Sequence, residues 1–340
     1  MPSRAVIIGP ASYAPDAGVQ AHDTIRKSAE MYKRVLDSDP LWGEDRVTVV
    51  PENELFQIVN VMNAVQKAAN EAQSGDILLV VYVGHGRCWT GVPDEQVHFA
   101  VNSSRRDMPY TWLSSWYLYR TMRLSKADLK VLIADCCYSN MLPDLGAGDP
   151  QLPGSLGVVH AGTCVLTAVK STDLARAEGC SHLPAEFAAC TPFSGHLLKV
   201  LSQGTRNHNN ELSLGLIRDA VEEELRSCGA PHDEPRMALN DAREVQPLFT
   251  NRMASELRRP ARRPATAEEW VTALFEGEIA HEDLLVDPDL AGDVVARLWV
   301  DQEESRRLTA HRINDGATKR FSKPTEFARY WARVERALYT

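Results

Sequence analysis

Two stretches of the sequence decide the fold: residues 80–86, which read VVYVGHG, and residues 131–140, which read VLIADCCYSN. Each stretch begins with an apolar run that has no polar alternation, and such a run is typical of a strand buried on both faces of a parallel sheet. Parallel strands deliver their carboxyl ends to one edge of the sheet, where the active sites of open α/β proteins assemble. We therefore expect His85 and Cys137 to lie side by side at that edge.

The rest of the first 250 residues alternates apolar runs with segments of helical periodicity. We expect strands at residues 5–9, 47–50, 76–83, 96–101, 130–134 and 164–169, and helices at residues 21–36, 53–73, 111–123, 194–202 and 212–226. Strands that alternate with helices indicate βαβ units. The predicted fold class is therefore α/β, with a mostly parallel sheet flanked by helices.

The composition changes around residues 252–264, which are rich in Arg, Pro and Ala, as is common in a connection between domains. Beyond this stretch, residues 266–275, 287–300 and 325–338 show helical periodicity with charged faces. We therefore expect one domain at residues 1–255 and a small α-helical module at residues 256–340.

Composition and charge argue against several classes of protein. The chain has 340 residues, 44% of them apolar, a formal net charge of −9 and seven cysteines. A general nucleic-acid binder needs a basic face, and a membrane or secreted protein needs a long uncharged apolar stretch that is absent here. An odd number of cysteines without a framework spacing favours free thiols. We expect a cytoplasmic protein that binds neither nucleic acid nor membrane.

His85 and Cys137 are the residue types of a cysteine protease dyad. In such a dyad a thiolate attacks a carbonyl carbon, and a neighbouring imidazole lowers the thiol pKa and later protonates the leaving amine. His85 precedes Cys137 by 52 residues, close to the roughly 50-residue offset of caspases. Gly84 and Gly86 flank the histidine and allow the backbone to turn sharply after the strand.

The two motifs resemble those of the caspase-like clan and are closest to its bacterial and metacaspase branch. In that branch the histidine stands in a GHG or SHG element, and the nucleophile stands in an Asp-x-Cys-x-Ser-Gly element after an apolar strand. This sequence has GHG at residues 84–86 and DCCYSN at residues 135–140. The resemblance extends over about residues 5–250 and implies a caspase-like fold.

The resemblance also implies a role for each residue of the site. Cys137 is the nucleophile and His85 is its partner. The backbone N–H groups of Gly86 and Cys137 form the oxyanion hole. Asp135 lines the primary specificity pocket, where it selects Arg or Lys, and Ser139 is a further substrate-binding residue.

The sequence departs from this branch at three positions. Asn140 stands where a glycine is usual, Val83 stands where a polar residue is usual, and the second acidic residue of the pocket aligns near Ser28. The preference for basic residues therefore depends on Asp135 alone. Asparagine tolerates unusual backbone angles, so the oxyanion hole is still expected. Because adjacent strand residues face opposite sides, Cys136 is expected to point into the core.

A metal site is the other interpretation of the cysteines and histidines. Cys180 and His182 stand close together, with Cys190 downstream and Cys88 upstream. This spacing fits no standard zinc pattern. We therefore expect a substrate-facing loop around residue 180, with no metal and no cofactor.

The predicted function is a cysteine endopeptidase that acts on protein substrates. Bacterial relatives are often joined to sensor modules in conflict or cell-death systems, so the module beyond residue 255 is expected to bind a nucleotide-type small molecule or a protein activator. The alternative is a non-catalytic caspase-like scaffold.

An enzyme specific for basic residues cannot cut itself between Lys130 and Lys170, where no Lys or Arg occurs, so the candidate self-cleavage sites are Lys170 and Arg176.

Overall fold

The computed structural model describes residues 3–89, 97–146, 162–169, 177–207, 209–240 and 242–257. The chain divides into two compact units, Met1–Ser202 with Ser213–Thr250, and Gln203–Leu212 with Asn251–Thr340. Helix α7 (Arg252–Leu257) occupies the position of the expected boundary near residue 255. Apart from the end of this helix, the helical module expected at residues 256–340 lies outside the described residues.

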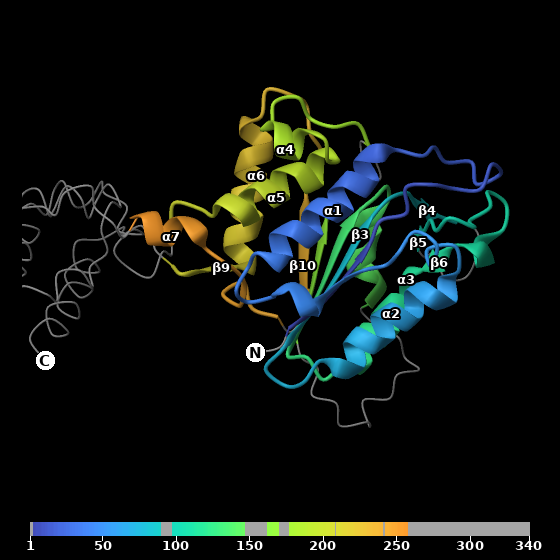
Figure 1. Cartoon of the computed structure of the whole chain (residues 1–340), viewed down its shortest axis with the longest axis horizontal. Coiled ribbons are helices and arrows are strands. Elements are labelled where there is room, and N and C mark those ends of the chain that lie inside the picture. The colour runs from blue at the N-terminus through green and yellow to red at the C-terminus, as the bar shows by residue number, and fades with distance from the viewer. Residues whose placement is uncertain are drawn as a thin grey trace, which may run out of the picture. The chain divides into compact units, whose positions relative to one another are not determined.

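A six-stranded sheet forms the centre of the first unit (Figure 1). In spatial order its strands are β10 (Arg236–Asn240), β8 (Gly162–Thr167), β7 (Leu129–Asp135), β3 (Ile77–Val83), β1 (Arg4–Ile8) and β2 (Val47–Val49). All neighbours pair in parallel except β10, which is antiparallel to β8. The predicted α/β class with a mostly parallel sheet is confirmed, and the arrangement is consistent with a caspase-like fold.

Helices cover both faces of this sheet. Helices α2 (Ile58–Glu71) and α3 (Ser115–Leu124) lie on one face, and α1 (Asp23–Asp37), α5 (Pro192–Gln203) and α6 (Leu214–Ser227) lie on the other (Figure 1). Strand β7 is apolar on both faces because helices cover both. Leu132 belongs to the core that α2 and α3 cover, whereas Ile133 lines a small cavity with Leu197 of α5 and Ile217 of α6.

The antiparallel edge strand β10 is not predicted by the sequence pattern. Its residues read RMALN, which is neither an apolar run nor a regular alternation, and residues 236–239 are all partly exposed. The strand is defined by its pairing with β8, from Arg236 opposite Thr167 to Asn240 opposite Thr163. Such a long-range partner leaves no periodic signal in a local window.

Two helices begin at least four residues later than their patterns predict. Helix α2 was expected from residue 53, but the N–H of Glu54 bonds to the carbonyl of Pro51 in a turn, and the helix begins at Ile58. Helix α3 was expected from residue 111, but residues 113–114 pair as a strand instead. The Ser114 hydroxyl then accepts the N–H of Trp116 and so caps the helix that follows.

A small antiparallel sheet begins directly after His85 in the chain. It consists of β4 (Gly86–Cys88), β5 (Val97–Phe99) and β6 (Leu113–Ser114). The remaining short elements are the 3-10 helices η1 (Glu44–Arg46), η2 (Pro109–Thr111) and η3 (Ser139–Gly146), the helix α4 (Ala185–Ala188), and the strands β9 (Glu211–Ser213) and β11 (Pro247–Thr250). In the described segments, no helix combines the length and the apolar character needed to cross a membrane.

Candidate active site

The two motif-bearing strands are direct neighbours in the sheet. Strands β3 and β7 pair in parallel, with Val83 opposite Asp135 at their carboxyl ends. The N–H of Gly84 then donates to the carbonyl oxygen of Asp135 at 3.0 Å, one residue beyond the ladder. His85 and Cys137 follow within two residues of that last pair. The expectation that both leave the sheet at one edge is confirmed.

An open cleft lies at this edge, and both His85 and Cys137 line it. Its volume is about 700 Å³, within the range of pockets that bind extended organic ligands. The other walls come from the loop before α1, from residues 177–182 and from residues 230–232. The structure therefore brings an imidazole and a thiol into one cavity large enough for a short peptide segment.

The His85 ring is held in one orientation. Its Nε2 lies 2.7 Å from the carbonyl oxygen of Gln20, which can only accept, so Nε2 carries the proton and Nδ1 keeps its lone pair. The ring packs edge-on against Tyr13, with 5.3 Å between ring centroids, and 5.7 Å from His22. Burial lowers the pKa of His85, and the nearby His22 lowers it further, against an opposing effect of the Gln20 carbonyl. The ring is thus neutral near pH 7 and able to take a proton.

Gly86 is the point of closest approach between the two motifs. A Cβ atom built there would lie 2.2 Å from the carbonyl oxygen of Cys137 and 2.9 Å from Sγ of Cys136. Any side chain at this position would push the histidine segment away from the cysteine segment. The glycine of the GHG motif is therefore required by packing, and it brings its own backbone next to that of Cys137.

The two adjacent cysteines have opposite environments. Cys136 is fully buried in the core with Tyr82 and Ala134, and burial raises the pKa of its thiol well above the usual range. Cys137 is partly exposed and lines the cleft. The prediction that Cys136 points into the core is confirmed, and Cys137 is the thiol of this pair that a substrate can reach.

An unusual backbone conformation follows Cys137, but not at the position that the sequence suggests. Among the described residues, Tyr138 is the non-glycine residue with a positive φ, at 59°. A left-handed conformation costs an ordinary residue about 1–2 kcal/mol, and here Tyr138 packs against the core while the Arg236 guanidinium donates to the carbonyl of Asn140 at 2.9 Å. The residue with the unusual backbone angles is thus Tyr138, and the conformational tolerance expected of Asn140 is not needed here.

The carboxylate of Asp135 is buried and receives three hydrogen bonds. Its Oδ2 accepts from the hydroxyl of Thr191 at 2.5 Å, from the hydroxyl of Ser194 at 2.6 Å and from the N–H of Ser194 at 3.2 Å. Burial raises the pKa of Asp135 and these hydrogen bonds lower it, the burial being the larger effect. Ser28, the aligned position of the family's second acidic residue, accepts the N–H of Thr191 at 3.0 Å and so supports this network.

Asp135 lines a small pocket together with a second carboxylate that the sequence analysis missed, Asp233. This pocket has a volume of about 20 Å³, enough for about one water molecule. It shares Pro192 and His232 with the large cleft, so the two cavities adjoin. Asp233 stands in an irregular segment before β10, where no motif marks it.

The remaining predicted site residues are placed differently or not described. Ser139 is fully buried, its hydroxyl has no hydrogen-bond partner among the described residues, and it does not line the cleft. The structure therefore shows no route by which Ser139 would touch a substrate in this conformation. Lys170 and Arg176, the candidate self-cleavage sites, lie outside the described residues.

A second group of reactive side chains lies beside the cleft and was also missed. One ligand atom from each of Cys180, His196, Cys228 and His232 lies within 4.8 Å of all the others. Of the metal ligands considered from the sequence, Cys180 alone belongs to this group. The signal that could have indicated it is Cys228-x-x-x-His232, a four-residue separation at the end of a predicted helix.

Comparison with known proteins identifies the fold and no more. No protein-family model matches this sequence, and no curated protein does. The crystal structure of protein GSU0716 from Geobacter sulfurreducens is similar, with a TM-score of 0.52 and 16% sequence identity. The similarity covers 74% of this chain and 99% of that chain. At this identity the likeness concerns the fold alone, and what the site does follows from its own residues.

Proposed function

We propose that this chain is a caspase-like cysteine endopeptidase in which Cys137 is the nucleophile and His85 is the general base and acid. The observation that carries the proposal is that His85 and Cys137 line one cleft at the joined ends of β3 and β7, while the neighbouring thiol of Cys136 faces the core. The GHG and DCCYS motifs support the same assignment.

The chemistry uses the groups that the cleft presents. The Cys137 thiol passes its proton to the free Nδ1 of His85, and the thiolate attacks the peptide carbonyl carbon to form a C–S bond. The backbone N–H groups of Gly86 and Cys137 stabilise the oxyanion. His85 then returns the proton to the leaving amine as the C–N bond breaks, and water hydrolyses the thioester.

The pocket beside Asp135 supports a preference for Arg or Lys before the scissile bond. It has two carboxylates, Asp135 and Asp233, and adjoins the cleft. Burial makes the charged form of Asp135 costly, and a cationic side chain would offset that cost by pairing with it. Because the pocket holds about one water, a basic side chain enters only after the pocket widens.

This closed pocket also bears on regulation and on the alternative function. A resting enzyme that opens its pocket on activation fits a role in a bacterial defence or cell-death pathway, with protein substrates in the cytoplasm and a nucleotide-type or protein activator acting on the C-terminal module. A non-catalytic caspase-like scaffold is the second candidate, and the same closed pocket is the observation that favours it.

Covalent labelling of the full chain distinguishes the two. A peptidyl acyloxymethyl ketone with Arg next to the reactive group is expected to alkylate Cys137, identified by peptide mass spectrometry. Cys137→Ala and His85→Ala should remove the label, and Cys136→Ala, which changes the buried neighbour, should keep it. The labelling is done with the chain alone and with the chain incubated in cell lysate, which would supply an activator. Absence of an adduct under both conditions supports the scaffold. An adduct that depends on Cys136 contradicts the assignment of the nucleophile.

A further inference from the structure

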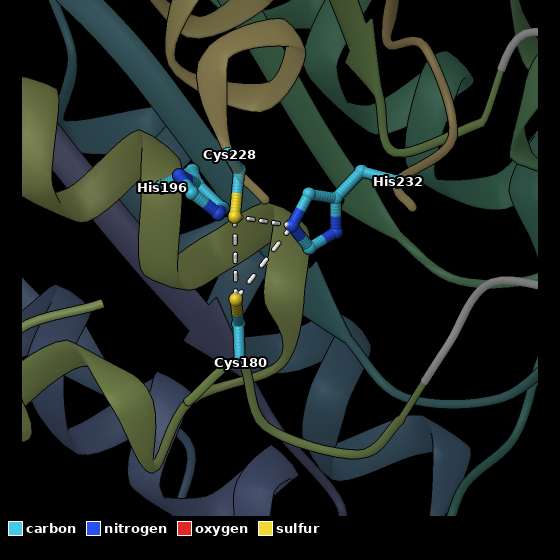
Figure 2. Close-up of side chains that lie close together, drawn as sticks. All are labelled: Cys180, His196, Cys228 and His232. Carbon is cyan, nitrogen blue, oxygen red and sulfur yellow. Dashed lines mark hydrogen bonds between the residues drawn. The ribbon is translucent and has the colours of Figure 1, made fainter. Parts of the chain in front are cut away.

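We infer that Cys180, His196, Cys228 and His232 bind one structural zinc ion beside the cleft. Figure 2 shows the four side chains pointing toward one another from separate segments of the chain. Cys180 lies in the loop before α4, His196 on α5, Cys228 at the end of α6, and His232 in the loop that follows. This site does not depend on the proposed function, because none of its four residues takes part in the dyad.

The distances within the cluster are close to those of a tetrahedral zinc site, with one sulfur–nitrogen distance about 0.5 Å shorter. Zinc binds sulfur at about 2.3 Å and imidazole nitrogen at about 2.0 Å, so a tetrahedron separates two sulfurs by about 3.8 Å and a sulfur from a nitrogen by about 3.5 Å. The two sulfurs, of Cys180 and Cys228, are 3.6 Å apart. Nε2 of His232 lies 3.6 Å from Sγ of Cys180 and 3.0 Å from Sγ of Cys228.

The buried side chain of His196 is independent evidence for a ligand at this cluster. The residue is only 2% exposed, and neither ring nitrogen has a hydrogen-bond partner among the described residues. Buried imidazoles are normally hydrogen-bonded, since an unsatisfied one costs about 1–3 kcal/mol. Oε2 of Glu224 faces Nδ1 of His196 at 3.8 Å. This separation is longer than a hydrogen bond, and the same oxygen accepts from Nζ of Lys199 at 2.6 Å. A carboxylate near one ring nitrogen still leaves the other nitrogen for a metal.

Three glycines hold the ligand-bearing segments close together. A Cβ at Gly179 would lie 2.1 Å from the carbonyl oxygen of Ala188, and one at Gly195 would lie 2.6 Å from Cδ1 of Leu183. At Gly229 it would lie 2.9 Å from Cε1 of His182. Each glycine is adjacent in sequence to one of the ligands. The close approach of these segments therefore coincides with the residues that converge on the cluster.

The donor set selects zinc and a structural role. Two thiolates and two neutral imidazoles form one of the common ligand sets of structural zinc, and four protein ligands leave no open position for a substrate. Binding releases the two thiol protons to solvent, and the two thiolates then neutralise the charge of the ion. Such a neutral centre is compatible with the partial burial of the cluster.

The position of the ion would stiffen the cleft. Cys180 and His232 line the large cleft, and His232 also lines the small pocket beside Asp135. A zinc ion would therefore tie the loop around residue 180 to the segment around residue 232 and to α5 and α6. In this way the metal would hold one wall of both cavities in place.

Metal analysis of the full chain, purified without a histidine tag, tests the inference. We expect about one zinc per chain in the wild type, and close to none in Cys228→Ser and in His196→Ala. The matched controls are His182→Ala, an exposed histidine two residues from Cys180, and Cys190→Ala, a buried cysteine outside the cluster. Both controls should keep the zinc. Full occupancy in the two ligand variants would overturn the inference.

Experiments on the wild-type chain keep the test decisive if a ligand variant does not fold. Removing zinc with a chelator should lower the melting temperature, and adding Co²⁺ should produce the visible absorption of a tetrahedral site with two thiolates. A wild type without zinc that gives no such Co²⁺ spectrum would overturn the site. So would a mass lower by two hydrogens with a Cys180–Cys228 crosslink, which would assign the pair to a disulfide. Peptidase activity is not part of any of these readouts, so failure of the proposed function leaves them unaffected.

Discussion

Gly86 lies directly against the backbone of Cys137, so that a Cβ at residue 86 would be 2.2 Å from the Cys137 carbonyl oxygen. The residue after the candidate base and the candidate nucleophile are thus in contact through their backbones. Gly86 and Cys137 are 51 residues apart in the chain. Their segments can touch because residue 86 has no side chain.

This contact predicts that Gly86→Ala lowers the activity of the protein that still folds. The methyl group must displace the turn that carries Cys137, and removing one donor of an oxyanion hole costs about 10²–10³-fold in rate. We expect a fall in kcat of that size, measured per folded molecule, together with a lower melting temperature because the methyl group meets backbone and a buried sulfur. Gly43→Ala, which has open space around its Cβ, is the control for a glycine change. It has positive φ, so its effect should be confined to stability.

Replacement of the dyad should abolish cleavage of a fluorogenic peptide with Arg before the scissile bond. Cys137→Ala and His85→Ala remove the nucleophile and its base, whereas Cys136→Ala changes a thiol that faces the core and should retain most of the activity. Initial rates of the three variants, normalised to folded protein, measure this. An inactive Cys136→Ala beside an active Cys137→Ala would reverse the assignment.

The pH profile should report the environment of His85. The ring acts as a base only when neutral, and its pKa is lowered from the usual value of about 6.5 by burial and by His22. The acid limb of kcat/KM is therefore expected below pH 6.5. His22→Ala removes a neighbouring charge and admits solvent, both of which raise the pKa, so the limb should move to higher pH. A limb that stays in place, or moves to lower pH, would contradict this account.

Selectivity should depend on both carboxylates of the small pocket. Asp135→Asn and Asp233→Asn are each expected to lower kcat/KM for Arg and Lys substrates by about tenfold or more, which corresponds to about 1.4 kcal/mol. Asparagine keeps the volume at residue 135, whereas Asp135→Ala would also leave the Thr191 and Ser194 donors without their acceptor. A peptide library cleaved mainly after Asp or after apolar residues would refute the basic preference.

Activation should not require a cut between residues 130 and 170. This span has no Lys or Arg, so an enzyme specific for basic residues cannot process itself there. We expect intact mass spectrometry of the fully active enzyme to show this span uncut, and Lys170→Ala with Arg176→Ala to remain activatable. An obligatory cut between residues 141 and 158 would show that a different mechanism, or a different protease, switches the enzyme on.

Local sequence determined the parts of this protein that depend on strand periodicity. The two apolar runs predict buried neighbouring strands. The alternation of β7 continues past its end at Asp135, so that Cys136 faces the core on the side of Ala134 and Cys137 lines the cleft. These features need no knowledge of which distant segment packs against them.

Tertiary structure alone decided the surroundings of Asp135 and the zinc site, because both depend on which distant loops and helices meet. Thr191 and Ser194 bind Asp135 from more than 50 residues away, and Asp233 completes the pocket from an irregular segment. Of the zinc-site residues, only Cys228 and His232 have a short spacing in the sequence, and Cys180 and His196 join them from the loop before α4 and from α5. Periodicity reports which face of an element is buried, whereas the packing of helices against the sheet determines which side chains meet there.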